Sequence, residues 1–133
     1  MRHLVKEATE SFSVGVVDVF PWSKFSLPQQ LPFGAQWYSL PPSSTSARDC
    51  HPEVELSVVI SGTASVEASG EITDVAAGES FLLGSEEAHF IHNRSADQPL
   101  MVFTTYWMPL DNRAGPDVVA PDVVAETAAP AQS

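Results

Sequence analysis

Two histidines and several carboxylates in the middle of the chain are spaced as a metal site would require. Asp49, His51 and Glu55 lie close together, and His89 follows in a separate segment. Imidazole nitrogens and carboxylate oxygens are the ligands that divalent transition metals such as Zn, Fe, Mn and Ni take in proteins. The sequence therefore predicts one such metal site, and Zn is the ion we favour for it.

Strand geometry explains how these residues could meet. Residues two apart in a strand share a face, so Asp49 and His51 can point together into the same interior. Pro52 favours a bend, after which Glu55 begins the next strand and returns its carboxylate to the same point. His89 enters from another strand. Ligands from separate strands would cover one side of an ion and leave positions open for water or substrate.

The segment 49–62 resembles the first motif of the cupin superfamily. That motif runs His-x-His, three or four residues, Glu, six residues, Gly. Its second histidine, glutamate and glycine fall on His51, Glu55 and Gly62, whereas Asp49 stands where the family usually has the first histidine.

The segment 78–93 resembles the second cupin motif, which runs Gly, five residues, Pro-x-Gly, two residues, His, three residues, Asn. Gly78, His89 and Asn93 match the pattern. Gly84 replaces the proline and Glu86 replaces the second glycine. Both motifs occur in order with a spacer of family size, and the likeness covers the middle of the chain.

The resemblance implies that His51, Glu55 and His89 bind the metal. Two roles remain open for Asp49, which either binds as a further ligand or only orients the others. A carboxylate such as Glu55 or Asp49, if not fully committed to the metal, could also carry a proton in catalysis.

The remaining polar residues near the motifs are expected to have structural roles and to lie outside the metal site. Glu53 lies in the Pro52 turn and is expected to be solvated, as are Glu86 and Glu87 in the turn before His89. His92 is out of phase with His89 and should face away. Cys50 should point to the opposite side from its neighbours as a small packed residue.

Short apolar or alternating stretches between turn residues predict an all-β sandwich or barrel. With the resemblance, the expected fold is a single-domain cupin, a jelly-roll barrel or double-stranded β-helix. Gly62, the Ser69-Gly70 pair, Gly78 and Gly84 are expected to form tight turns. The candidate strands are 12–20, 35–40, 46–51, 55–61, 63–68, 71–75, 80–83, 88–93 and 100–106, with a weak helical turn possible at 5–10.

The chain divides into a barrel domain over residues 1–113 and an acidic Pro/Ala/Val tail over 114–133 that is expected to be disordered. The Pro- and aromatic-rich arm 20–38 should lie across the barrel surface or contact a partner subunit. The aromatic residues are expected mostly in the core or a dimer interface, with a subset lining a substrate pocket. The resemblance also suggests a homodimer.

Composition narrows the possible functions. The net charge is −11, with only six Lys and Arg residues among 133. Binding to nucleic acid or to an anionic membrane is therefore not expected. One cysteine allows no disulfide within the chain, and neither a secretion signal nor an 18-residue apolar run is evident. A cytoplasmic location is expected.

A faint resemblance to the cupin epimerases of β-methyltryptophan biosynthesis implies a reaction. It suggests metal-dependent epimerisation or isomerisation of a small, aromatic keto acid in secondary metabolism. Two alternatives remain open. One is an Fe(II)-dependent dioxygenase acting on a small aromatic substrate, and the other is a cupin that only binds a small molecule.

Overall fold

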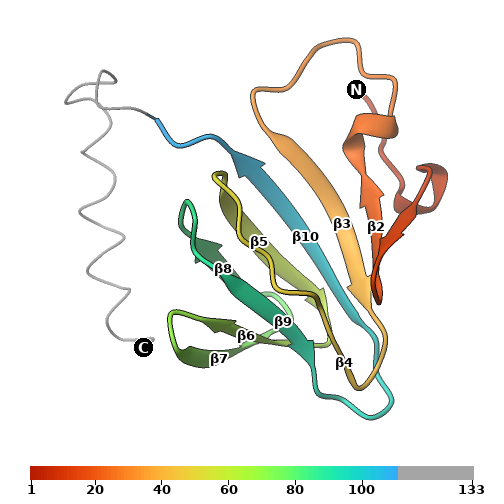
Figure 1. The fold of residues 1–133 in the computed structure, drawn as a ribbon. Coiled ribbons are helices and arrows are strands. Elements are labelled where there is room, and N and C mark those ends of the chain that lie inside the picture. Colours follow the sequence, from red (N-terminus) through yellow and green to blue (C-terminus); the bar gives the residue numbers. More distant parts are fainter. Residues whose placement is uncertain (111–133) are drawn as a thin grey trace.

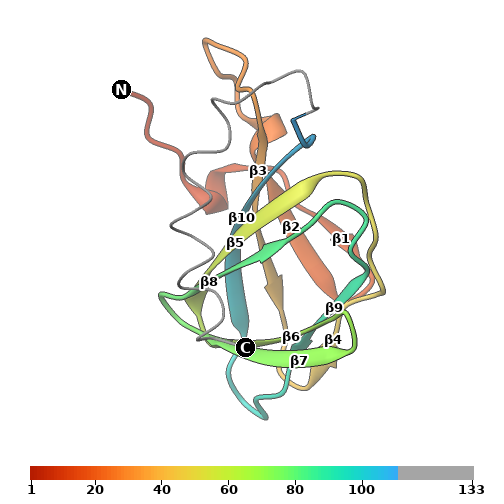
Figure 2. The same ribbon diagram turned by 90° about the vertical axis from the view of Figure 1, so that its left-hand side faces the viewer.

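The computed structural model describes residues 1–110, which form two antiparallel β-sheets packed face to face. The six-stranded sheet has the order β1-β2-β3-β10-β5-β8, and the four-stranded sheet has the order β4-β9-β6-β7 (Figures 1 and 2). The chain crosses repeatedly between the sheets, as in a jelly roll. This confirms the all-β fold that the sequence predicts. The elements are η1 (Lys6–Ala8), β1 (Phe12–Val14), β2 (Val17–Pro21), η2 (Trp22–Lys24), β3 (Gly34–Leu40), β4 (Ser44–Thr45), β5 (Val54–Ser61), β6 (Thr63–Ala68), β7 (Glu71–Ala76), β8 (Ser80–Leu83), β9 (His89–Asn93) and β10 (Leu100–Trp107).

Strand alternation builds the core between the sheets. In β5, Glu55, Ser57 and Val59 are buried, while Leu56 and Ile60 on the other face are exposed. Strand β9 alternates in the same way. Burial of the inward apolar side chains supplies the main stabilisation of such a sandwich. The apolar core comprises Val19, Tyr38, Leu40, Val59, Ala64, Val66, Val75, Leu83, Ile91, Leu100 and Val102.

Two of the predicted strands are wrong in detail. The single strand predicted over 12–20 is a hairpin of β1 and β2, turned at Gly15 with a φ of +59°. The strand predicted over 46–51 does not form. Only β4 precedes it, and Asp49 makes an isolated antiparallel bridge to His89.

Turns form at all four predicted glycine positions. Gly62, Gly70 and Gly78 have φ values of +82°, +77° and +87°, a region that only glycine enters without strain. Gly84 opens the fourth turn, which the Glu87 N–H closes by donating to the Gly84 carbonyl at 3.2 Å. In that turn Glu86 takes the left-handed conformation, with a φ of +60°.

Replacement of Glu86 by glycine should stabilise the protein by about 0.5–1 kcal/mol, because a side chain in the left-handed region is strained. The free energy of unfolding, measured by urea denaturation, tests this. The Glu86→Ala variant is the matched control, since it removes the carboxylate but keeps Cβ. An equal gain in both variants would show that the charge of Glu86, rather than its backbone conformation, is unfavourable.

Within the arm over 20–38, Trp22 and Phe25 pack against aromatic side chains of the six-stranded sheet, while the ends of the arm belong to β2 and β3. Trp22 of η2 lies 5.9 Å from Trp37 and 5.4 Å from Phe103, measured between ring centroids. Phe25 meets Trp37 edge to face. These contacts are those expected of a segment on the barrel surface, while its contact with a partner subunit stays a prediction.

The tail predicted over 114–133, and the last three residues of the predicted domain, lie outside the described residues. Within residues 1–110, no helix has the length and apolar character needed to cross a membrane.

Candidate metal centre

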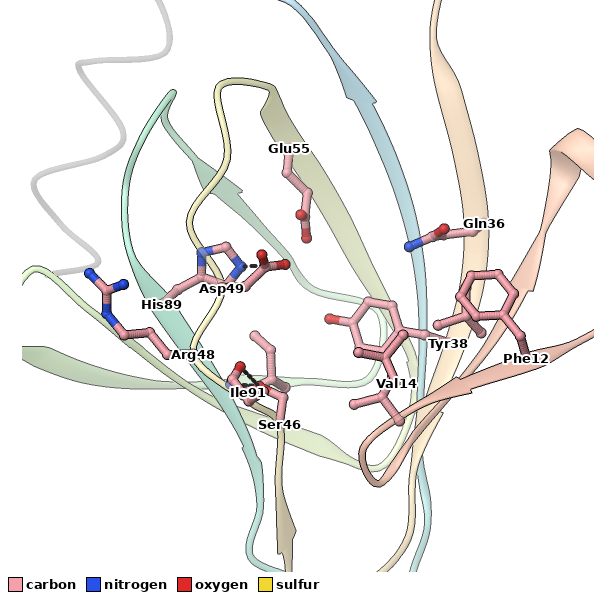
Figure 3. Close-up of a pocket in the computed structure, with 13 residues that line it drawn as sticks. Phe12, Val14, Gln36, Tyr38, Ser46, Arg48, Asp49, Glu55, His89 and Ile91 are labelled. Carbon is pink, nitrogen blue, oxygen red and sulfur yellow. Dashed lines mark hydrogen bonds and ion pairs between the residues drawn. The ribbon is translucent and has the colours of Figure 1, made fainter.

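Asp49, His51 and His89 converge at one point between the two sheets. Each offers one ligand atom, and these three atoms all lie within 4.8 Å of one another. Asp49 is held in place by its bridge. Its N–H donates to the His89 carbonyl at 3.0 Å, and its carbonyl accepts from the His89 N–H at 2.9 Å. Side chains of directly opposed residues leave a sheet on the same face. The bridge therefore replaces the predicted strand in bringing Asp49 and His89 together (Figure 3).

Both histidines are oriented by backbone carbonyls. His51 Nδ1 lies 3.1 Å from the Glu53 carbonyl oxygen, and His89 Nδ1 lies 2.8 Å from that of Glu87. A carbonyl oxygen only accepts, so Nδ1 carries the hydrogen and a neutral ring keeps a free lone pair on Nε2. The two Nε2 atoms lie 3.8 and 3.9 Å from Asp49 Oδ2. This is the arrangement in which metal-binding histidines are usually held.

Glu55 stands beside this cluster. Its Oε1 lies 3.2 Å from His51 Nε2, and its Oε2 accepts a hydrogen bond from Ser57 Oγ at 3.0 Å. In a neutral His51 of this orientation, Nε2 and Oε1 are both acceptors, and a shared cation or proton would relieve their repulsion. The residue is 9% exposed, so its charge is largely shielded from water.

The donor set therefore fits a divalent transition metal. Two imidazole nitrogens and a carboxylate converge with their lone pairs directed inward, and a second carboxylate adjoins them. Of the predicted ligands, the structure places Asp49, His51 and His89 in the tightest group and Glu55 at its edge. Asp49 lies 3.8 and 3.9 Å from the two Nε2 atoms with a side chain that is 61% exposed, so both roles expected for it stay open.

A cavity of about 260 Å³ adjoins the candidate metal centre (Figure 3). Asp49, Glu55 and His89 form one side of it, and Tyr38 reaches into it from β3 on the opposite side. The rest of the wall is largely apolar. The other lining residues are Phe12, Val14, Val17, Val19, Gln36, Ser46, Ala47, Arg48 and Ile91.

The sequence did not identify Tyr38 or Phe12 as cavity residues. Adjacent aromatic residues in a strand point to opposite faces, so one of Trp37 and Tyr38 had to face inward. Only the register of β3 against β2 and β10 decides that it is Tyr38. Phe12 lines the cavity from β1, the edge strand of the six-stranded sheet.

The structural interpretation of His92 is confirmed. Its Nε2 lies 2.8 Å from Glu67 Oε1, and its Nδ1 lies 2.8 Å from Thr45 Oγ1, on the face of the sheet away from the metal centre. Glu53 is half-buried, and its carboxylate lies 3.7 Å from His51 Nδ1. It therefore contacts the back of that ring and is not freely solvated.

Cys50 is not packed as expected, and the Glu87 carboxylate is not simply solvated. Cys50 faces away from the cluster but is exposed, with Sγ 3.5 Å from the Glu86 carbonyl oxygen. The Glu87 carboxylate accepts hydrogen bonds from Gly84 N–H at 2.9 Å and Ser69 Oγ at 2.7 Å. The Gly84 bond, then the Ser69 bond, lowers the pKa of Glu87. Glu87 thus holds together the turn whose carbonyl orients His89.

The fold and this site define a small jelly-roll barrel with a histidine and carboxylate cluster between its sheets. Residues 36–106 match the family model described as the cupin domain. The chain therefore belongs to the cupin family, as its two motifs indicated. No curated protein matches the chain.

Solved structures confirm the fold. A plu4264 protein from Photorhabdus luminescens is 20% identical with a TM-score of 0.69, and the match covers 86% of this chain and 89% of that one. A cupin 2 conserved barrel domain protein from Salinispora arenicola is 19% identical with a TM-score of 0.67, covering 85% and 89%. A predicted oxalate decarboxylase from Thermotoga maritima is 16% identical with a TM-score of 0.65, covering 81% and 100%. Similarity at these identities concerns the fold alone.

Proposed function

We propose that this cupin is a metal-dependent enzyme that catalyses proton transfer, as epimerisation or isomerisation, on a small aromatic keto acid. Zn is the metal we favour. The observation that carries the proposal is a buried carboxylate, Glu55, placed beside the Asp49, His51 and His89 cluster where that cluster meets the cavity. A carboxylate next to a cation and a cavity can remove a proton from a bound molecule and return it.

In the proposed reaction, the residues around the cavity have separate roles. The metal, when bound, would act as a Lewis acid that polarises the carbonyl of the substrate. Glu55 carries the proton, and the Ser57 hydroxyl holds one of its oxygens so that the other faces His51. The apolar wall, including Val19 and Ile91, excludes water from the aromatic part of the substrate.

Deuterium incorporation tests this proposal. The Zn-loaded protein, incubated in D2O with an aryl keto acid bearing a β-methyl group, should introduce deuterium at the β carbon faster than buffer alone. NMR and mass spectrometry would measure the exchange and any change of configuration. Exchange no faster than in buffer containing free Zn would contradict the proposal.

One observation favours the Fe(II) dioxygenase as a second candidate. Two histidines and one carboxylate in the tightest group are the ligand set of the facial triad in non-haem Fe(II) oxygenases. Fe in the purified protein, with oxygen consumption dependent on an aromatic substrate, would support this candidate over proton transfer.

The homodimer stays a prediction, which sedimentation analysis of the purified protein can test.

A further inference from the structure

The Tyr38 hydroxyl is a buried polar group inside the cavity without a hydrogen-bond partner. The residue is 7% exposed, and among residues 1–110 no atom pairs with its hydroxyl. Ser57 lies near enough to lower the pKa of Tyr38 somewhat, but its hydroxyl does not meet that of Tyr38 in hydrogen-bond geometry. Buried hydroxyls are nearly always hydrogen-bonded, so an unpaired one facing a cavity indicates a missing acceptor.

The environment of Tyr38 keeps its hydroxyl protonated, so that it can donate a hydrogen bond. Burial is the main cause that raises the pKa of Tyr38 well above its usual value, and the charge of Glu55 acts in the same direction. The phenol is therefore neutral and keeps its hydrogen at physiological pH. A neutral buried phenol that cannot ionise is suited to donate to an oxygen that carries negative charge.

The position of the Tyr38 hydroxyl in the cavity indicates which acceptor it would bind. Tyr38 lies in β3 opposite Val19 and Val102, and its hydroxyl points across the cavity toward the side that holds Asp49 and Glu55 (Figure 3). A molecule between them would have its polar end within reach of both the phenol and the metal centre. Its apolar part would lie along the wall that includes Val14 and Ile91.

We propose that Tyr38 is a substrate-binding residue whose hydroxyl donates a hydrogen bond to a carboxylate or carbonyl oxygen of a small aryl keto acid held in the cavity. The class of ligand rests on the proposed function, whereas the role of the phenol as a donor rests on its burial and direction. Neither cupin motif in the sequence includes this residue.

Calorimetric titration of the Zn-loaded protein with phenylpyruvate tests the inference. The Tyr38→Phe variant should bind about 10- to 100-fold more weakly than the unmodified protein, since it loses a hydrogen bond to a charged oxygen. Its unfolding temperature without ligand should be unchanged or higher, because the substitution removes an unpaired buried hydroxyl. A purely structural tyrosine would show the opposite pattern, with lower stability and unchanged affinity.

Tyr106→Phe is the matched control. Tyr106 also has a raised pKa, caused by partial burial and then by Glu53 and Glu55, but it does not line the cavity. This variant should bind phenylpyruvate as the unmodified protein does. Equal affinity of the Tyr38→Phe and unmodified proteins, or no binding by the unmodified protein, would overturn the inference. Binding that depends on Tyr38 without deuterium exchange would sustain it while contradicting the proposed reaction.

Discussion

Replacement of His89 by alanine should leave a folded protein that has lost its metal ion. Substitution of a residue that only orients a metal ligand typically lowers the affinity for the metal by about 10- to 100-fold. Removal of a ligand itself should therefore weaken metal binding by more than about 100-fold. His89 is one of three residues in the tightest group and has its Nε2 lone pair directed inward. Metal content after dialysis, measured by mass spectrometry of protein purified without a histidine tag, would show the loss.

The matched control is His92→Ala. This histidine lies on the same strand, but its ring pairs with Glu67 and Thr45 on the other face. The variant should keep the full metal content of the unmodified protein. If both variants retained the metal, or both lost it, the assignment of His89 as a ligand would be wrong.

Replacement of Glu55 by glutamine should lower the rate of deuterium exchange by about 100- to 10,000-fold, the usual contribution of a general acid or base. The amide has nearly the same shape as the carboxylate but cannot take up the proton. The protein should keep its metal, because Asp49, His51 and His89 remain in place. Exchange rates and metal content, measured on the same preparation, test both parts.

Glu53→Gln is the control for this second prediction. Its carboxylate lies 3.7 Å from His51 Nδ1, on the far side of the ring from the cluster, so the exchange rate should change little. A slow Glu55→Gln variant that had also lost its metal would make Glu55 a ligand, contrary to its role as proton carrier. An unchanged rate would exclude it from the chemistry.

Much of the fold follows from local pattern. Short apolar or alternating stretches over 55–61 and 100–106, and glycines at 62, 70 and 78, predict β5, β10 and the turns that the structure shows. The inward direction of His89 follows from the same alternation, whereas that of His51, whose segment forms no strand, was expected from the family motif. These features depend on residues near one another in the chain, which is why a single sequence reveals them.

Other features depend on contacts between distant segments. Asp49 reaches the metal centre through its bridge to His89, and no local strand pattern predicts that pairing. Tyr38 faces the cavity because of the register of β3, which pairs with strands on both sides. Glu86 adopts a glycine-like conformation because the surrounding hydrogen bonds impose the turn, overriding its own preference.

Anomalous diffraction from crystals of the Zn-loaded protein would locate the bound ion. We expect one strong peak at about 2.0–2.2 Å from Nε2 of His51, Nε2 of His89 and an oxygen of Asp49. Open coordination positions of that ion should face the cavity reached by Tyr38. A peak bound elsewhere, or these three side chains ordered with no ion among them, would contradict this expectation.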